Sequence, residues 1–212
     1  MILEKEMKMK SYFFRLLVVI IFGTLWVVSH GCTSSPSSRF YALTSTTASG
    51  PETKPLADDG CLSLGIGPIN LPDYLSLPQI VTQTAPNEFK FAEFDRWAEP
   101  LKDNFTRILA KNLSNQVCTK VILLFPWRGG IPIDYRVEME VLRLDGSLGG
   151  NVSLEAWWMV FSGDRKRMLL AKKSTFTEAV GGHDYKSFVS AQSRVLGHLS
   201  REIAEAIRTL PQ

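Results

Sequence analysis

The sequence is poor in the side chains that carry most enzyme and metal chemistry. It has three cysteines and three histidines in 212 residues, and neither Cys61 nor Cys118 has a second Cys or His at metal-ligand spacing. There is no G-x-S-x-G elbow. Gly65-x-Gly67 lacks the third glycine of a nucleotide-binding loop, and Pro68 blocks a helix start there. We therefore expect no catalytic residue, no metal and no bound cofactor.

A strong excess of one charge is also lacking, because 24 Lys and Arg face 21 Asp and Glu. The one dense basic cluster, at residues 165–167 with Lys172 and Lys173, is typical of a solvated hairpin, with contact to lipid headgroups as the alternative. Nucleic-acid binding needs a basic face of clustered Lys and Arg, and a solvated hairpin does not supply one. We therefore expect no binding to nucleic acid. The pair His183-Asp184 suggests a hydrolase dyad only if a suitably placed serine accompanies it.

No apolar run is long enough to span a bilayer. The longest, Leu16–Val28, has thirteen residues, whereas a spanning helix needs about 20. It follows a basic head that starts at either Met1 or Met7, which is typical of a secretory signal. We assign residues 1–31 to a signal peptide.

The residue after the small stretch 29–31 is Cys32, and a Ser-rich segment follows it. This arrangement resembles a bacterial lipobox, which implies a covalent lipid on Cys32 and a membrane anchor that does not span the bilayer. Ordinary secretory cleavage nearby is the alternative. Thr33 in place of Asp favours the outer membrane, by resemblance to sorted lipoproteins. Residues 32–59 are then a lipidated flexible tether with a short edge strand near Phe40, and residues 60–212 form one domain.

Two cysteines remain once Cys32 is assigned to lipid. Cys61 and Cys118 each precede a strand-like segment. If these strands run parallel on either side of a crossover helix, both thiols lie at the same end of the sheet, close enough for a disulfide. Two buried free thiols are the alternative.

The apolar periodicity predicts an α+β fold: one mixed sheet with a crossover helix, an antiparallel meander and a long C-terminal helix packed on the sheet. Two prolines predict that residues 68–75 form a rigid exposed turn. Trp157, Met159 and Phe161 make the second face of their strand apolar, so we expect that strand to be central. The predicted elements are strands at 62–69, 79–83, 88–94, 121–125, 135–141, 152–161 and 167–178, and helices at 98–116 and from Asp184 onwards.

Several motifs occur in one order along the chain: Phe40-Tyr41-x-Leu43, a proline-bracketed segment from Gly67 to Val81, the run from Arg96 to Leu101, and Asp184-Tyr185. Over residues 40–207 the chain thereby resembles the ABC-type transport auxiliary lipoproteins. The resemblance implies a non-catalytic, outer-membrane-tethered partner of a mammalian-cell-entry (MCE) protein, in an intermembrane transport system for lipid or another hydrophobic solute.

An assembly role suggests an exposed interface, and Leu71, Pro72, Tyr74 and Leu75 are our candidates for it. The alternative is that their loop folds back onto the core. We also expect a homo-oligomer. A periplasmic lipid carrier is the competing function, and it would need an enclosed apolar cavity, for which the Trp157 face is the candidate lining.

Overall fold

The computed structural model describes Arg15, Leu17, Val18 and Ile20, then residues 36–46, 60–127 and 130–211. Among these residues, no helix is long and apolar enough to cross a membrane. Cys32 and most of the predicted signal peptide lie outside the described residues. The chain divides into two compact units, residues 1–37 and residues 38–212. We call the second unit the body.

The body is α+β, as predicted, and its strands form two sheets. The five-stranded sheet has the order β5-β2-β6-β7-β8 and the three-stranded sheet has the order β1-β4-β3. The elements, in chain order, are β1 (Arg39–Tyr41), β2 (Leu62–Asn70), the short 3-10 helix η1 (Asp73–Leu75), β3 (Gln79–Ala85), β4 (Glu88–Trp97), α2 (Leu101–Ser114), β5 (Thr119–Leu124), β6 (Tyr135–Gly146), β7 (Asn151–Ser162), β8 (Met168–Ala179) and α3 (Tyr185–Thr209).

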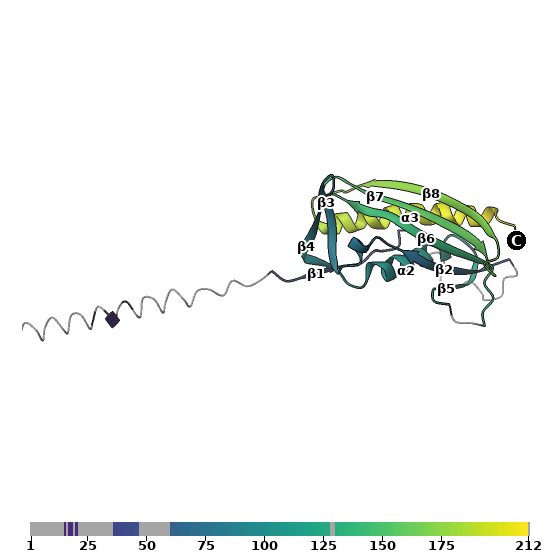
Figure 1. Cartoon of the computed structure of the whole chain (residues 1–212), viewed down its shortest axis with the longest axis horizontal. Helices are drawn as coiled ribbons and strands as arrows, with labels where there is room; N and C mark the ends of the chain where they lie inside the picture. Colours follow the sequence, from purple (N-terminus) through teal and green to yellow (C-terminus); the bar gives the residue numbers. More distant parts are fainter. Residues whose placement is uncertain are drawn as a thin grey trace, which may run out of the picture. The chain divides into compact units, whose positions relative to one another are not determined.

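The five-stranded sheet is mixed. Strand β2 pairs in parallel with β5 and β6, and β6, β7 and β8 form the predicted antiparallel meander. Helices α2 and α3 pack against one face of this sheet, and α3 runs along β7 and β8 (Figure 1). On that face the alternate side chains of β7, from Val152 to Val160, are fully buried. The central position of β7 in the meander is confirmed.

The prediction of a single sheet was wrong. The hairpin of β3 and β4 pairs antiparallel, as predicted, but its outer partner is β1, which runs parallel to β4. Periodicity identifies strands without identifying their partners, because the pairing of distant strands depends on tertiary packing. The two sheets are joined by side chains described below.

The prediction that the turn begins at Pro68 was also wrong. Strand β2 continues to Asn70 and lies between β5 and β6. Its pairing with β6 shifts register between Ile66 and Ile69. Pro68 sits in this irregularity, where a missing N–H interrupts the ladder least. The turn is therefore confined to the residues between β2 and β3, and it contains η1.

Cys61 and Cys118 are joined by a disulfide, with their Cα atoms 4.7 Å apart. Leu62 pairs with Thr119 in the parallel register of β2 and β5, which brings the two preceding cysteines to the same end of the sheet. The bridge closes a loop over a sequence separation of 57. It therefore ties the edge strand β5 to β2 at the point where both strands begin.

Helix α3 begins as predicted, with Asp184 as its N-cap. The Asp184 carboxylate accepts a hydrogen bond of 2.7 Å from the backbone N–H of Ser187. This bond holds the pKa of the Asp184 carboxyl below its ordinary value. Helix α2 is shorter than predicted, because Pro100 stands at its N-cap instead of inside its first turn.

Part of the predicted flexible tether belongs to the body. After β1, residues 43–46, which we call the strap, follow the groove between α2 and α3. The backbone N–H of Leu43 donates 2.6 Å to Oδ1 of the buried Asn104, and the N–H of Thr44 donates 3.1 Å to Oγ of the buried Ser193. Gly197 of α3 leaves room for the strap, since a Cβ there would lie 2.1 Å from Oγ1 of Thr46.

Candidate docking surface on the open face of the sheet

The segment predicted as an interface lies partly in the core. Leu75 is 3% exposed, and Leu71 and Tyr74 are half-buried against the core. Pro72 is half-buried at the start of η1. A role of these four residues in partner binding stays a prediction, and Leu75 has almost no surface to offer to it.

Tyr74 joins the two sheets. Its hydroxyl donates a hydrogen bond of 2.7 Å to Oδ2 of Asp145 on β6, and its ring stacks on Phe89 of β4 with centroids 4.8 Å apart. Burial, together with the bond to Asp145, raises the pKa of the Tyr74 hydroxyl. Arg143 of β6 adds a second link, because it donates 2.9 Å to the side chain of Gln83 on β3. The proline-bracketed segment of the sequence therefore contains a residue that connects the two sheets.

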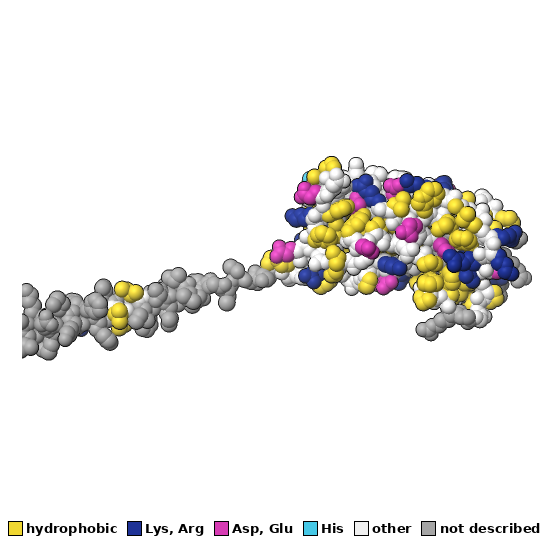
Figure 2. Space-filling model, in the orientation of Figure 1, with side chains coloured by type: hydrophobic (Ala, Val, Ile, Leu, Met, Phe, Trp, Pro, Cys, Tyr) yellow, Lys and Arg dark blue, Asp and Glu magenta, His cyan; other side chains and the backbone are white. Residues whose placement is uncertain are grey.

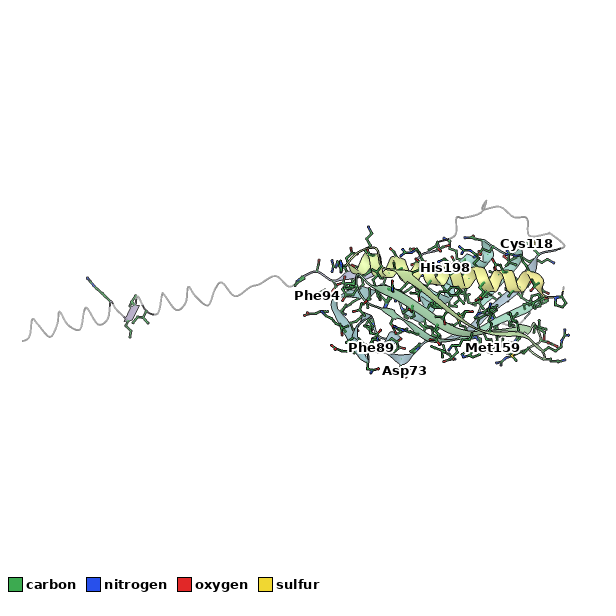
Figure 3. The ribbon with its side chains drawn as sticks, turned by 90° about the horizontal axis from the view of Figure 1, so that it is seen from above. Asp73, Phe89, Phe94, Cys118, Met159 and His198 are labelled. Carbon is green, nitrogen blue, oxygen red and sulfur yellow. A yellow bond between two sulfur atoms is a disulfide. The ribbon has the colours of Figure 1, made fainter. Side chains whose placement is uncertain are left out.

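The face of the five-stranded sheet opposite α2 and α3 is open and rich in apolar side chains. Trp157 is 46% exposed, Leu142 of β6 is 42% exposed, and Met168 at the start of β8 is 59% exposed. Met159 and Phe161 are half-buried between them. Figure 2 shows hydrophobic side chains gathered on this side of the body, and Figure 3 shows Met159 on the side of the sheet away from α3 and His198.

Charged side chains interrupt this apolar surface in pairs. Glu138, only 6% exposed, binds Arg165 at 2.8 Å, and Lys173 pairs with Glu155. In the sheet register Trp157 lies directly between Glu140 and Lys173. An apolar centre with charged side chains around it, two pairs of which form salt bridges, is typical of a protein-protein interface, and a patch of this kind on a free protein marks an interaction site. We call this surface, formed by Leu142, Trp157, Met159, Phe161 and Met168, the open face.

Sequence patterns did not identify the edge of this surface formed by Trp127. Its ring lies against Gly65 of β2, where an added Cβ would come within 3.1 Å of it, and the guanidinium of Arg136 lies 4.5 Å above the ring centroid. The Trp127 indole N–H donates 3.3 Å to the carbonyl of Leu123. A glycine inside a strand often marks a close approach of this kind, so Gly65 was the available signal.

The groups considered for chemistry have structural roles in the body. Asp184 caps α3, and His183 is exposed. His198 lies 2.8 Å from Oε1 of Glu178, whose other oxygen accepts a hydrogen bond from Arg194. The hydrogen bond from Arg194, and to a smaller extent the one with His198, lowers the pKa of the Glu178 carboxyl. The described residues contain no cluster of three His, Cys, Asp or Glu side chains that could hold a metal ion.

The Trp157 face does not support a lipid-carrying function, because its side chains form an exposed surface and line none of the four pockets below. Four pockets among the described residues have volumes of about 280 to 530 Å³. The most apolar lining among them belongs to a pocket of about 280 Å³ between α2 and the ends of β2 and β5, where Pro68 and Phe125 meet Lys102 and Arg107. The linings of the other three pockets are less apolar, and each includes charged side chains.

Comparison with known proteins identifies the family to which this chain is similar. Residues 41–204 match the model of a family described as the ABC-type transport auxiliary lipoprotein component. Two relatives, from Escherichia coli K12 and Shigella flexneri, are each described as intermembrane transport lipoprotein PqiC. Each is 26% identical over 194 residues, covering 91% of this chain and 98% of the relative.

Solved structures share the fold. The crystal structure of an uncharacterized protein superposes with a TM-score of 0.65 at 19% identity, over 81% of this chain and 99% of that one. A protein from Xanthomonas campestris gives a TM-score of 0.59 at 17% identity, over 78% of this chain and 92% of that one.

Proposed function

This chain belongs to the ABC-type transport auxiliary lipoprotein family, and we propose that it is an outer-membrane lipoprotein that docks a periplasm-spanning MCE protein without catalysing a reaction itself. The relatives named above are intermembrane transport lipoproteins. A component of such a system has to be held at one membrane and to bind the partner that reaches it from the other. Docking, and not chemistry, is then the task of the body.

The observation that carries the proposal is the open face. It presents Trp157, Leu142 and Met168 to solvent, on a sheet whose other face is already covered by two helices. Large aromatic side chains and methionines are enriched at protein interfaces, where a few of them supply most of the binding free energy. We propose that the MCE partner, or a neighbouring copy of this chain in a homo-oligomer, covers this surface.

Attachment to the membrane rests on the sequence. The thirteen-residue apolar run, the small residues before Cys32 and the Ser-rich stretch after it support lipidation of that thiol. Several acyl chains together hold a protein on a bilayer almost permanently, because each buried CH₂ contributes about 0.8 kcal/mol. Thr33 next to Cys32 supports the outer membrane as the destination.

The test is purification of the full-length protein from detergent-solubilised envelopes, followed by native mass spectrometry. Docking predicts a discrete complex that contains an MCE-domain protein, a homo-oligomer, or both. A monomer that carries bound phospholipid and no MCE protein would contradict docking and favour the lipid-carrier function. Trp157→Glu in the same purification tells whether the open face is the surface used.

A further inference from the structure

We propose that the body rests against phospholipid headgroups through Phe40, Phe94 and Arg96 on the outer face of the three-stranded sheet, together with Leu77 in the segment that leads into β3. We call these four residues the membrane-contact face. The inference rests on the proposed lipidation of Cys32, and it adds which surface of the body then meets the bilayer.

The first argument is the length of chain between the lipid and the body. Only six residues separate Cys32 from Arg39, where β1 begins. Seven extended Cα steps reach at most about 25 Å. Helix α3 alone has 25 residues, which makes it about 37 Å long at 1.5 Å per residue. The lipid therefore holds the β1 end of the body near the bilayer, while the other end can stand clear of it.

The second argument is that β1 cannot easily peel away to lengthen the tether. Beyond β1, the strap is fixed by hydrogen bonds from Leu43 to Asn104 and from Thr44 to Ser193. Arg39 is itself paired with Asp95 at 2.8 Å, and Tyr41 donates 2.8 Å to the same carboxylate. Releasing β1 would leave the buried carboxylate of Asp95 without these partners, and releasing the strap would leave the Oδ1 atom of Asn104 without its donor, which costs free energy in both cases.

The third argument is the chemistry of the face that this geometry presents. Alternation along β1 and β4 sends Tyr41, Asp95 and Trp97 inward, so Phe40, Phe94 and Arg96 lie on the outer side. Phe40 is 64% exposed, more than any other large apolar side chain that the structure describes, and Leu77 is 45% exposed. Figure 3 shows Phe94 at the β1 end of the body.

Arg96 supplies the polar half of an interfacial site. It is the cross-strand neighbour of both Phe40 and Gln79. Its Nε is buried without a hydrogen-bond partner, and among the described residues its guanidinium forms no ion pair. Aromatic rings at the headgroup level, beside an arginine that can bind phosphate, are the usual composition of a surface that contacts a membrane.

The opposite end of the body provides the control. The loop between β5 and β6 leads into Tyr135, which pairs with Leu64 near the disulfide end of the sheet, and Figure 3 places Cys118 at the end of the body away from Phe94. Ile131 in this loop is 50% exposed, so it is about as accessible as Phe40 and Leu77. Because the short tether by itself favours contact at the β1 end, the comparison with Ile131 tests which end of the body meets lipid, and a lengthened tether is needed to test the membrane-contact face itself.

The experiment places a photo-crosslinking phenylalanine analogue at position 40, 77 or 131 of the full-length lipidated protein. The protein is reconstituted in vesicles of phosphatidylethanolamine and phosphatidylglycerol. Because burial of one aromatic ring favours the contact state, we expect about tenfold more lipid adduct from position 40 than from position 131. Position 77 should also give more lipid adduct than position 131. The test therefore still works if the variant at position 40 fails to fold.

A lengthened tether sharpens the test. With the six residues before Arg39 doubled by Gly-Ser repeats, the lipid no longer holds the β1 end close to the bilayer, and position 40 should still give more lipid adduct than position 131. Equal adducts at positions 40 and 131, or a larger yield at 131, would overturn the inference. Crosslinks from position 40 to protein instead of lipid would overturn it too. Failure of lipidation is distinguishable, because the chain would then not bind the vesicles at all.

Discussion

The hydroxyl of Tyr74 donates a hydrogen bond of 2.7 Å to Asp145, a carboxylate that is 2% exposed. This bond connects the segment between β2 and β3 to β6, and the same tyrosine stacks on Phe89 of β4. Tyr74 therefore belongs to the joint between the two sheets, and its half-buried ring is held from both sides.

Tyr74→Phe removes this bond and leaves Asp145 with Arg143 as its remaining side-chain partner. We expect the free energy of unfolding to fall by about 1 to 3 kcal/mol, the cost of depriving a buried polar group of a partner. Denaturant unfolding measures it. Unchanged stability together with loss of MCE binding would contradict the structural role and favour the interface role predicted from the sequence.

The strap makes a second prediction. Asn104→Ala should lower the free energy of unfolding by about 1 to 3 kcal/mol, because the backbone N–H of Leu43 would remain buried without its acceptor. The matched control is Lys102→Ala, an exposed position on the same helix, which should change stability by no more than about 0.5 kcal/mol. Equal effects of the two variants would show that the strap contributes nothing to the stability of the body.

The disulfide predicts sensitivity to reduction. In the chain-entropy model, closing a loop of this length stabilises a protein by up to about 4 kcal/mol. Denaturant unfolding with and without dithiothreitol should therefore differ, and a Cys61→Ser, Cys118→Ser double variant should match the reduced protein. A double variant that unfolds at the same denaturant concentration as the oxidised protein would rule out a stabilising bridge.

Glu178 predicts a loss of stability in acid. Arg194 and His198 hold its pKa below the ordinary value of 4.5. A carboxyl whose pKa is lowered by folding contributes stability above its unfolded pKa, and the contribution disappears as the pH falls through the folded pKa. Glu178→Gln should therefore lower the melting temperature at pH 7 and have little effect near pH 3. The control is Glu205→Gln on the exposed side of α3.

The open face predicts a variant that separates docking from folding. Trp157→Glu should leave the free energy of unfolding within about 1 kcal/mol of the original, since the side chain is already 46% exposed, but it should abolish capture of the MCE partner. Phe91→Glu is the matched control, because Phe91 is 45% exposed on the other sheet. Equal capture by both variants would exclude the open face as the surface that docks the MCE partner.

Much of this fold follows from local patterns. Asp184 before a long apolar stripe predicts the cap of α3, and two cysteines that precede similar strands predict the parallel arrangement that brings them together. Pro68 misleads, because one irregularity in the β2 ladder lets a proline sit in a central strand. Local rules say where a ladder is weakened, whereas the neighbouring strands decide whether it continues.

The strap and the open face show what sequence patterns miss. A Ser- and Thr-rich segment has the composition of a flexible tether. The signal against that interpretation is on α2, where Asn104 and Asn112 stand among buried apolar positions and need hydrogen-bond partners from another segment. The apolar second face of β7 was visible in the sequence. Whether helices cover that face depends on the packing of the whole chain, and here both helices lie on the other side.

The lipid on Cys32 is the central claim, and incorporation of labelled palmitate tests it most directly. Cells that express the full chain are grown with the label, and the protein is purified and its outer-membrane content compared with that of Cys32→Ala. We predict label in the original protein and none in the variant, which should leave the outer-membrane fraction. An unlabelled original protein, or an unlabelled Cys32→Ala variant that remains in the outer membrane and supports transport, would contradict the claim.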